Sequence, residues 1–390
     1  MSSLDNLLEA VRTLEPVIRR HAAEAERERK LSAPVAAAMR AAGLYGMWCP
    51  KAFGGLEVDP TTAFRVIEEI SRIDSAAGWN LQASTVADLL GAWFPAAGAA
   101  EVFRDPRTIL ASAFFPPRSA VPVDGGYRVT GRTTFVSGAC EADWIAGLAH
   151  VLDGGEPRLG PDGQPLTLLT MFPRTDVEII DNWDTLGMCG TGSHDVSVTD
   201  VFVPERRAVP WVPLQLPPAA YAGPLYRLTV WPIVGALAVP SLGVARAAIQ
   251  ALIELATRKT PAYTTKTLKD RPAVQSQLAY AEATLGAVRA YLYEAFAEAW
   301  TEAIAARRLT PEHKARIQLA ATTATLASAE VVDLVHTAVG ATGIRCEQPF
   351  QRHFRDAHVL TQHAYISPSR YESVGRLMLG LDPEWGFFSF

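Results

Sequence analysis

Residues 183–204 read WDTLGMCGTGSHDVSVTDVFVP, and this stretch carries the most specific structural pattern in the 390-residue chain. Its first half holds three glycines, which permit tight turns and a close approach of the backbone to its neighbours. In its second half, Val196, Val198 and Val201 alternate with polar residues, as in a strand with one buried face. The stretch therefore predicts a turn-rich segment that leads into a β-strand, with a mainly structural role.

The chain around this stretch divides into three regions. Helical periodicity runs through the first region, disappears in the second, where Asp124, Gly125 and Gly126 predict a hairpin turn, and returns in the third. We expect an N-terminal α-helical domain, a small antiparallel β-domain and a C-terminal four-helix bundle, over residues 1–107, 108–213 and 214–390. The long, Ala-rich helices expected in the bundle cover residues 241–259, 272–307 and 311–339.

Composition narrows the class of protein. Hydrophobic residues make up 49% and charged residues 20%, and the net charge of -5 argues against nucleic acid as a partner. No run of 18 apolar residues is free of charge and proline, so no membrane partner is expected. The four cysteines lie far apart and the histidines His353, His358 and His363 are spaced by five, so neither disulfides nor a metal site are expected. A cytoplasmic protein fits this pattern.

The order of helices, sheet and bundle resembles the acyl-CoA dehydrogenase superfamily over essentially the whole chain. Residues 183–204 are similar to the segment that closes the β-domain throughout that superfamily, and residues 49–55, CPKAFGG, are similar to its Pro-x-x-x-Gly-Gly loop. The resemblance implies an α+β fold of the acyl-CoA dehydrogenase type and a flavin cofactor.

Residues 354–377 indicate a branch of this superfamily. Arg355 and Asp356 open the segment, and the dehydrogenases often place a glutamate nine residues after the arginine. Here that position is Ala364, with His363 just before it, which resembles the two-component, flavin-dependent aromatic hydroxylases. The resemblance implies that His363 is catalytic, either beside the reactive oxygen or as the base for a phenolic or N–H proton.

The same resemblance implies a reaction. A separate flavin reductase supplies reduced flavin, FMN or FAD, between which the sequence does not choose. Molecular oxygen adds at flavin C4a as a hydroperoxide, and one oxygen atom passes to an aromatic or heteroaromatic small molecule. The expected function is therefore a reduced-flavin-dependent monooxygenase.

Residues 133–138, TTFVSG, resemble the dehydrogenase segment Trp-Ile-Thr-Asn-Gly, which lies against the flavin. The resemblance implies that Phe135 packs on the flavin ring and that the Ser137 hydroxyl meets flavin N5. A hydrogen bond that holds the N5 proton slows loss of hydrogen peroxide, so Ser137 is expected to be catalytic as well as cofactor-binding. Ser112 is assigned to the same cofactor site.

Three further residues are expected to reach the flavin of a neighbouring subunit. Arg258 matches an arginine that binds the flavin phosphate, although Pro261 stands where the family has Phe, and Gly340 and Gly343 match a glycine turn. A solvated arginine at a helix end and a simple helix C-cap are the alternative interpretations. The resemblance implies a homo-oligomer, which we expect to be a tetramer.

The substrate is expected to contact Trp79, Trp93 and Tyr365. Residues 206–253 contain no Asp or Glu, so this region offers no carboxylate base for removal of an α-proton. Its apolar side chains belong either to an aromatic-substrate pocket or to the core; they are Leu214, Tyr221, Leu225, Tyr226, Trp231 and Ile233. Three alternatives stay open: an acyl-CoA dehydrogenase with an unrecognised base, an N-hydroxylating monooxygenase, and a non-catalytic flavin-fold binding protein.

Overall fold

The computed structural model describes residues 3–91, 93–160, 163–211, 221 and 223–390. Its N-terminal part is helical, as the periodicity predicts. Asp59 caps α3 by accepting the backbone N–H of Thr62 at 3.0 Å, and Phe64 and Ile67 are fully buried one turn later. The helices of this part are α1 (Ser3–Glu28), α2 (Ala33–Ala41), α3 (Pro60–Ile73), α4 (Ser75–Gly91) and α5 (Ala96–Val102).

The middle of the chain forms one sheet with strand order β6-β7-β2-β1-β3-β5-β8, and β4 pairs with β3. The predicted hairpin turn joins β1 to β2, with Val123 opposite Gly126. The expectation of an antiparallel domain is wrong in one place, because β1 and β3 run parallel. The strands are β1 (Leu110–Val123), β2 (Gly126–Thr133), β3 (Trp144–Asp153), β4 (Glu156–Pro157), β5 (Thr167–Pro173), β6 (Glu178–Ile180), β7 (Asp195–Pro204) and β8 (Ala208–Pro210).

The C-terminal part is a bundle built on long helices. It contains α6 (Pro224–Arg227), α7 (Pro232–Ala256), α8 (Pro272–Ile304), α9 (Pro311–Val339), α10 (Phe350–Leu360) and α11 (Ser369–Met378). The helix α7 begins earlier than predicted, because it continues through Pro240. The predicted division between residues 213 and 214, and Leu214 itself, lie outside the described residues.

By length and composition alone, α7 is the one described helix that could cross a membrane. In its most apolar stretch 89% is buried within the protein, and α7 packs against α3, α8 and α9. We therefore interpret α7 as the core helix of the bundle.

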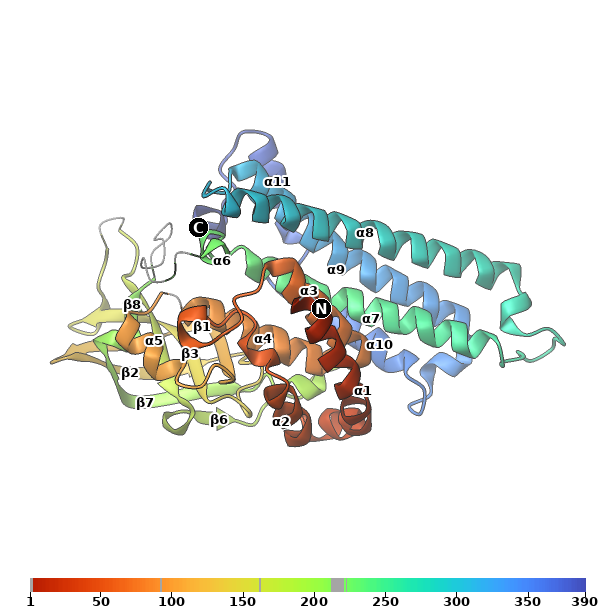
Figure 1. Ribbon diagram of the computed structural model, residues 1–390, viewed down its shortest axis with the longest axis horizontal. Coiled ribbons are helices and arrows are strands. Elements are labelled where there is room, and N and C mark those ends of the chain that lie inside the picture. Colours follow the sequence, from red (N-terminus) through yellow and green to blue (C-terminus); the bar gives the residue numbers. More distant parts are fainter. Residues whose placement is uncertain (1–2, 92, 161–162, 212–220, 222) are drawn as a thin grey trace.

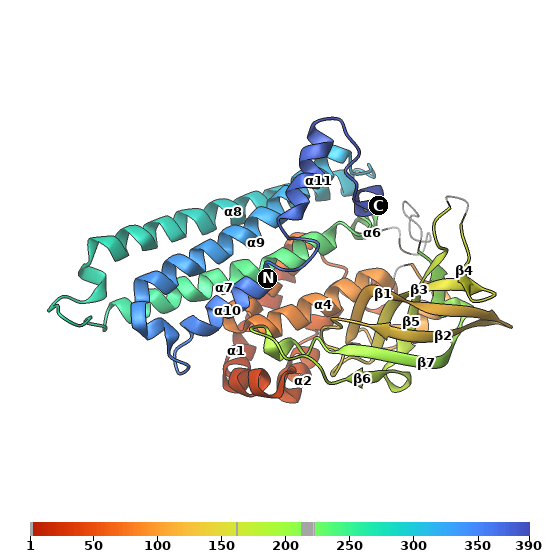
Figure 2. The same cartoon turned by 180° about the vertical axis from the view of Figure 1, so that it is seen from behind.

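Figures 1 and 2 show the sheet at one end of the molecule and the long bundle helices at the other. Between them lies α4, which packs against β1 on one side and against α3 and α7 on the other. Because α4 touches both halves, side chains on it can face the sheet and the bundle at the same time.

Asp356 on α10 joins the three parts of the chain. Its carboxylate accepts the hydroxyl of Ser75, at the start of α4, at 2.5 Å and the backbone N–H of Met188 at 2.6 Å. Arg352, one turn earlier, lies 3.6 Å from the same carboxylate. Burial raises the pKa of Asp356, and these partners hold the buried group in place.

Candidate functional site

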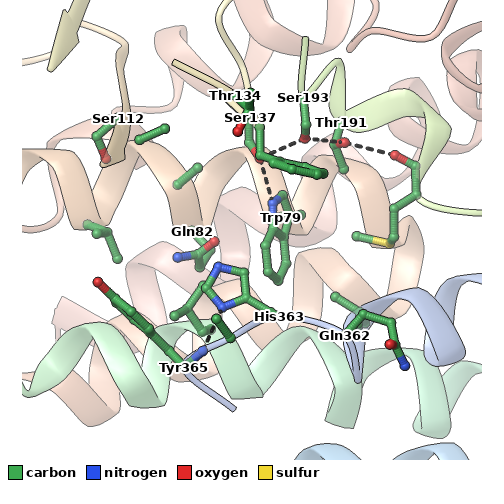
Figure 3. A pocket seen from close by; sticks show the side chains of 18 of the residues that line it. Trp79, Gln82, Ser112, Thr134, Ser137, Thr191, Ser193, Gln362, His363 and Tyr365 are labelled. Carbon is green, nitrogen blue, oxygen red and sulfur yellow. Dashed lines mark hydrogen bonds between the residues drawn. The ribbon is translucent and has the colours of Figure 1, made fainter. Parts of the chain in front are cut away.

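A cavity of about 490 Å³ opens where the sheet, α4 and the bundle meet (Figure 3). Six parts of the chain line it: α4, strand β1, the loop after β2, the turns before β7, α7, and the end of α10 with the segment that follows it. The polar side chains in its lining are Gln82, Ser112, Thr134, Ser137, Thr191, Ser193, Gln362, His363 and Tyr365. Within the described lining, no residue is Asp, Glu, Lys or Arg.

The remaining lining is aromatic and aliphatic, with Trp79, Phe114 and Phe135 among the rings and Ile233 and Leu237 from α7. A space of this kind suits a flat, apolar group that is oriented by a few polar contacts. Among the described members of the apolar set expected in residues 206–253, Ile233 alone lines the cavity. Four of the others, Tyr221, Leu225, Tyr226 and Trp231, are buried in the core.

Ser137 lies at the centre of a hydrogen-bonded group. The indole N–H of Trp79 donates to Ser137 Oγ at 2.9 Å, and Ser137 Oγ lies 2.7 Å from Ser193 Oγ. Ser193 Oγ lies 2.7 Å from Thr191 Oγ1, and the Thr191 hydroxyl donates to the Met188 carbonyl at 2.8 Å. Figure 3 shows this line of contacts along one wall of the cavity.

Phe135 occupies an unusual conformation beside Ser137. Its φ of 60° is left-handed, which is rare for a bulky residue, and its side chain is 69% exposed. The backbone around it is tied to the turns before β7, because the N–H of Val136 donates to His194 and the N–H of Gly138 donates to Thr191. The loop thus holds an aromatic ring at the cavity without burying it in the core.

His363 lines the opposite wall and stacks edge-on to Trp79, with ring centroids 5.7 Å apart. Burial lowers the pKa of His363 to about 4, so the ring is neutral at physiological pH. The backbone N–H of Tyr365 donates to His363 Nδ1 at 3.3 Å. Since Nδ1 accepts, the ring proton lies on Nε2, and His363 can donate one hydrogen bond to a bound molecule.

Gln82 projects from α4 into the same cavity. Gln82 is 2% exposed, and its amide is not one of the sealed, unpartnered polar groups of the described residues, so it opens onto the space of the cavity. An amide that faces such a space can bond to a bound molecule or to water. Gln82 is therefore a candidate for recognition of a polar group on the ligand.

These features fit the isoalloxazine ring of a flavin. Phe135 and Trp79 offer aromatic surface in the cavity lining, and Ser137 retains hydrogen-bonding capacity there. The residues that would hold the ring are those that the sequence predicts, with Ser112 and Thr134 on the adjoining strand and loop.

The structure brings together most of the predicted site residues. Ser112, Phe135, Ser137, Trp79, His363 and Tyr365 all line the cavity. The Tyr365 ring also packs against Trp385 and Phe387, at 5.6 Å and 5.1 Å, and burial raises its pKa to about 12. Trp93 does not line the cavity; its ring lies 6.0 Å from Trp211, which in turn stacks on Phe114.

Arg258, Gly340 and Gly343 lie elsewhere. Arg258 follows the end of α7, and Gly340 and Gly343 follow the end of α9, at the end of the bundle farthest from the sheet (Figure 1). Lys259 joins these two helix ends through a bond from its Nζ to the carbonyl of Val339. Within one protomer these three residues do not contribute to the cavity.

Sequence reasoning missed Gln82, Gln362, Thr191 and Ser193 as cavity residues. The sequence signal for the last two is the Thr-Gly-Ser run inside the glycine-rich turns, a stretch for which the sequence predicts a mainly structural role. Met188 and Gly192 have left-handed φ values of 55° and 54°, and this curvature turns the two hydroxyls inward.

Comparisons with known proteins agree with the geometry. The family model "Acyl-CoA dehydrogenase, N-terminal domain" matches residues 4–93, and "Acyl-CoA dehydrogenase, C-terminal domain" matches residues 236–368. An indole-3-acetate monooxygenase from Pseudomonas putida is 35% identical over 366 residues, which cover 93% of this chain and 91% of the relative. The oxygenase subunit HsaA of Mycobacterium tuberculosis, a flavin-dependent monooxygenase, is 29% identical over 394 residues. The match covers 98% of this chain and 96% of the relative.

A solved structure is similar along its whole length. XiaF from Streptomyces sp., in complex with FADH2 and glycerol, has a TM-score of 0.90 and 30% identity, and the match covers 98% of this chain and 97% of XiaF. The fold and the branch expected from the sequence are thereby confirmed. This chain belongs to the acyl-CoA dehydrogenase family, within its branch of enzymes that use reduced flavin as monooxygenases.

Proposed function

We propose that this enzyme hydroxylates an uncharged aromatic or heteroaromatic molecule, with reduced flavin delivered by a separate reductase. The observation that carries the proposal is the cavity lining, which is apolar and, within the described residues, free of ionised side chains. A buried carboxylate or ammonium group on the substrate would meet no opposite charge there, at a cost of several kcal/mol. A neutral ring would meet Gln82 and the Nε2–H of His363 instead.

When bound, reduced flavin would supply the two electrons that activate molecular oxygen, and molecular oxygen supplies the atom that is transferred. The chain's own part is to bind, orient and exclude water. We assign Ser137, held by Trp79, to the flavin N5 proton, and Phe135 and Ser112 to packing and contacts on the ring. The apolar walls shelter the reacting atoms from water.

We assign His363 to hydrogen-bond donation toward the reacting oxygen rather than to proton abstraction. The support is its pKa of about 4, which leaves the imidazole a weak base, and the position of its proton on Nε2. Gln82 and Tyr365 are assigned to orientation of the substrate, because both reach the cavity from the side of α4 and the bundle. Trp93 can act on the substrate only through Trp211 and Phe114.

We further propose a homotetramer, built as a dimer of dimers, in the cytoplasm. Large apolar side chains exposed on the bundle and after it support an interface; they include Ile344 at 70%, Met378 at 75% and Leu379 at 79%. In such an assembly Arg258, Gly340 and Gly343 would approach the flavin of a neighbour. The four free cysteines fit a reducing compartment.

The test is a coupled assay with the purified protein, an independent flavin reductase, NADH and either FMN or FAD. We expect oxygen-dependent formation of a product heavier by one oxygen atom from neutral aromatic probes such as indole or a simple phenol. Mass spectrometry detects the added oxygen atom, and NMR spectroscopy of the product distinguishes hydroxylation at carbon from hydroxylation at nitrogen. Turnover of acyl-CoA probes with an artificial electron acceptor and no oxygen would refute the proposal.

A further inference from the structure

The direction of each hydrogen bond beside Ser137 follows from a count of protons. Each hydroxyl owns one proton. Thr191 donates its proton to the Met188 carbonyl at 2.8 Å, so between Thr191 and Ser193 it is Ser193 that donates. Ser193 has then used its proton, so across the 2.7 Å contact with Ser137 it is Ser137 that donates.

The indole N–H of Trp79 can only donate, and it donates to Ser137 at 2.9 Å. The whole line therefore points one way, from Trp79 through Ser137, Ser193 and Thr191 to the Met188 carbonyl. Ser137 has given away its proton and has accepted one. Its remaining capacity is one lone pair, and Ser137 lines the cavity.

We propose that Thr191 and Ser193 are positioning residues that keep the Ser137 hydroxyl an acceptor, so that the site prefers reduced flavin, whose N5 carries a proton, over oxidised flavin. The inference rests on the proposed function, because it needs the flavin N5 beside Ser137. Neither Thr191 nor Ser193 is proposed to touch the substrate.

Oxidised flavin presents a bare N5 nitrogen, which requires a donor. Ser137 can donate to it either by giving up its bond to Ser193, or by reversal of the whole line, with Thr191 donating to Ser193 and Ser193 to Ser137. The first route loses the bond between Ser137 and Ser193, and the second loses the bond from Thr191 to the Met188 carbonyl. The preference for reduced flavin is thus worth about one buried hydrogen bond, roughly 2- to 12-fold in relative affinity.

Because the three hydroxyls are buried, water does not replace a hydrogen bond that one of them loses. Thr191 is 1% exposed, Ser193 4% and Ser137 9%. Three hydroxyls in a sheltered row polarise one another, which reinforces a common direction. A site of this design releases oxidised flavin after turnover and accepts the next reduced flavin from the reductase.

The test measures the dissociation constants of oxidised flavin in air and of reduced flavin under anaerobic conditions, with the full-length protein. In Thr191→Val the Ser193 proton loses its acceptor, so Ser193 donates to Ser137 and Ser137 is free to donate to N5. We expect the ratio of reduced to oxidised affinity to fall about 3- to 10-fold. Ser193→Ala removes the acceptor of the Ser137 proton and should act in the same direction.

Two controls separate the effect of hydrogen-bond direction on the affinity ratio from the effect of losing a buried hydroxyl. Thr191→Ser keeps the hydroxyl and should keep the wild-type ratio. Thr85→Val removes a comparable buried bond, from the Thr85 hydroxyl to the Leu81 carbonyl at 2.8 Å on α4, but Thr85 does not line the cavity. This control should leave the ratio unchanged.

A wild-type ratio in either Thr191→Val or Ser193→Ala overturns the inference, and Ser193→Ala alone decides it if Thr191→Val does not fold. The proposed function fails separately, if the wild-type protein binds neither oxidised nor reduced flavin. A lower ratio in both variants together with wild-type behaviour in both controls supports the inference.

Discussion

The backbone N–H of Tyr365 donates to Nδ1 of His363 at 3.3 Å, so the imidazole keeps its proton on Nε2. The donor is a backbone N–H of the same chain, two residues after His363, and not a side chain, so mutation of Tyr365 to any residue except proline leaves the bond in place. His363 is thereby a fixed, neutral donor in the wall of the cavity.

His363→Ala should lower the rate of product formation about 10- to 100-fold, the value of one well-placed hydrogen bond in a dry site. His363→Asn keeps a donor and should retain most of the activity. The measurements are product yield per NADH and flavin affinity, and flavin affinity should be nearly unchanged. Equal losses in the Ala and Asn variants would show instead that the imidazole itself transfers a proton.

The lowered pKa of His363 predicts how the stability of the fold depends on pH. The unfolded chain takes up a proton near pH 6.5, whereas the folded chain takes it up only near pH 4. Between these values the unfolded state binds more protons, so the contribution of His363 to stability is complete above pH 6.5 and is lost as the pH falls toward 4. Chemical denaturation across this window should show a steeper decline in wild type than in His363→Asn.

Ser137→Ala removes the hydroxyl that we propose as the acceptor for the flavin N5 proton, and it leaves the Trp79 indole N–H without its partner. We expect more hydrogen peroxide and less product per NADH consumed. Peroxide assay with and without substrate measures this coupling. Ser84→Ala, in a buried serine of α4 outside the cavity lining, serves as the control; coupling as tight in Ser137→Ala as in wild type would remove Ser137 from the N5 position.

Substrate charge can be tested with a matched pair of probes. Indole and indole-3-acetate share one ring system, and only the second carries a carboxylate. Because the described lining has no cation, indole should have a kcat/KM at least about tenfold higher. Gln82→Leu should lower kcat/KM for neutral probes about tenfold by removing the amide that faces the cavity, and a preference for indole-3-acetate in wild type would contradict the proposal.

Substitution of Arg258 tests whether the flavin site is shared between subunits. Arg258→Ala should weaken flavin binding by about 1.5–3 kcal/mol if its guanidinium holds a phosphate across a subunit interface. Lys266→Ala, in the loop between α7 and α8, is a control for loss of a positive charge. Light scattering should show a tetramer for the wild type, and a monomer that binds flavin tightly would rule out a shared site.

The architecture could be predicted because helix and strand periods differ and because residues 183–204 are so specific. The parallel pairing of β1 with β3 could not, since nothing in either strand encodes which neighbour it meets in the sheet. The start of α7 was also missed, because Pro240 suggests a break, although the helix continues through it.

Where a single residue matches a family position, as for Ser137 and His363, the sequence predicted a site residue and the structure places it in the cavity lining; its role stays a prediction. The sequence did not indicate the cavity residues that match no such position. Thr191 and Ser193 follow glycine turns whose direction is known only once the backbone is folded, and Gln82 lies on α4, where almost every residue is buried and no polar face stands out.

The carboxylate of Asp356 meets Ser75, 281 residues away, and the N–H of Met188, 168 residues away. Contacts between such distant segments form only after most of the chain has been ordered, which slows folding. They also mean that the helical, sheet and bundle parts share one buried contact and lose it together. Heating should therefore melt the protein in a single cooperative transition, and a fragment that stops before α10 would leave Ser75 and the turn at Met188 without the group that joins them.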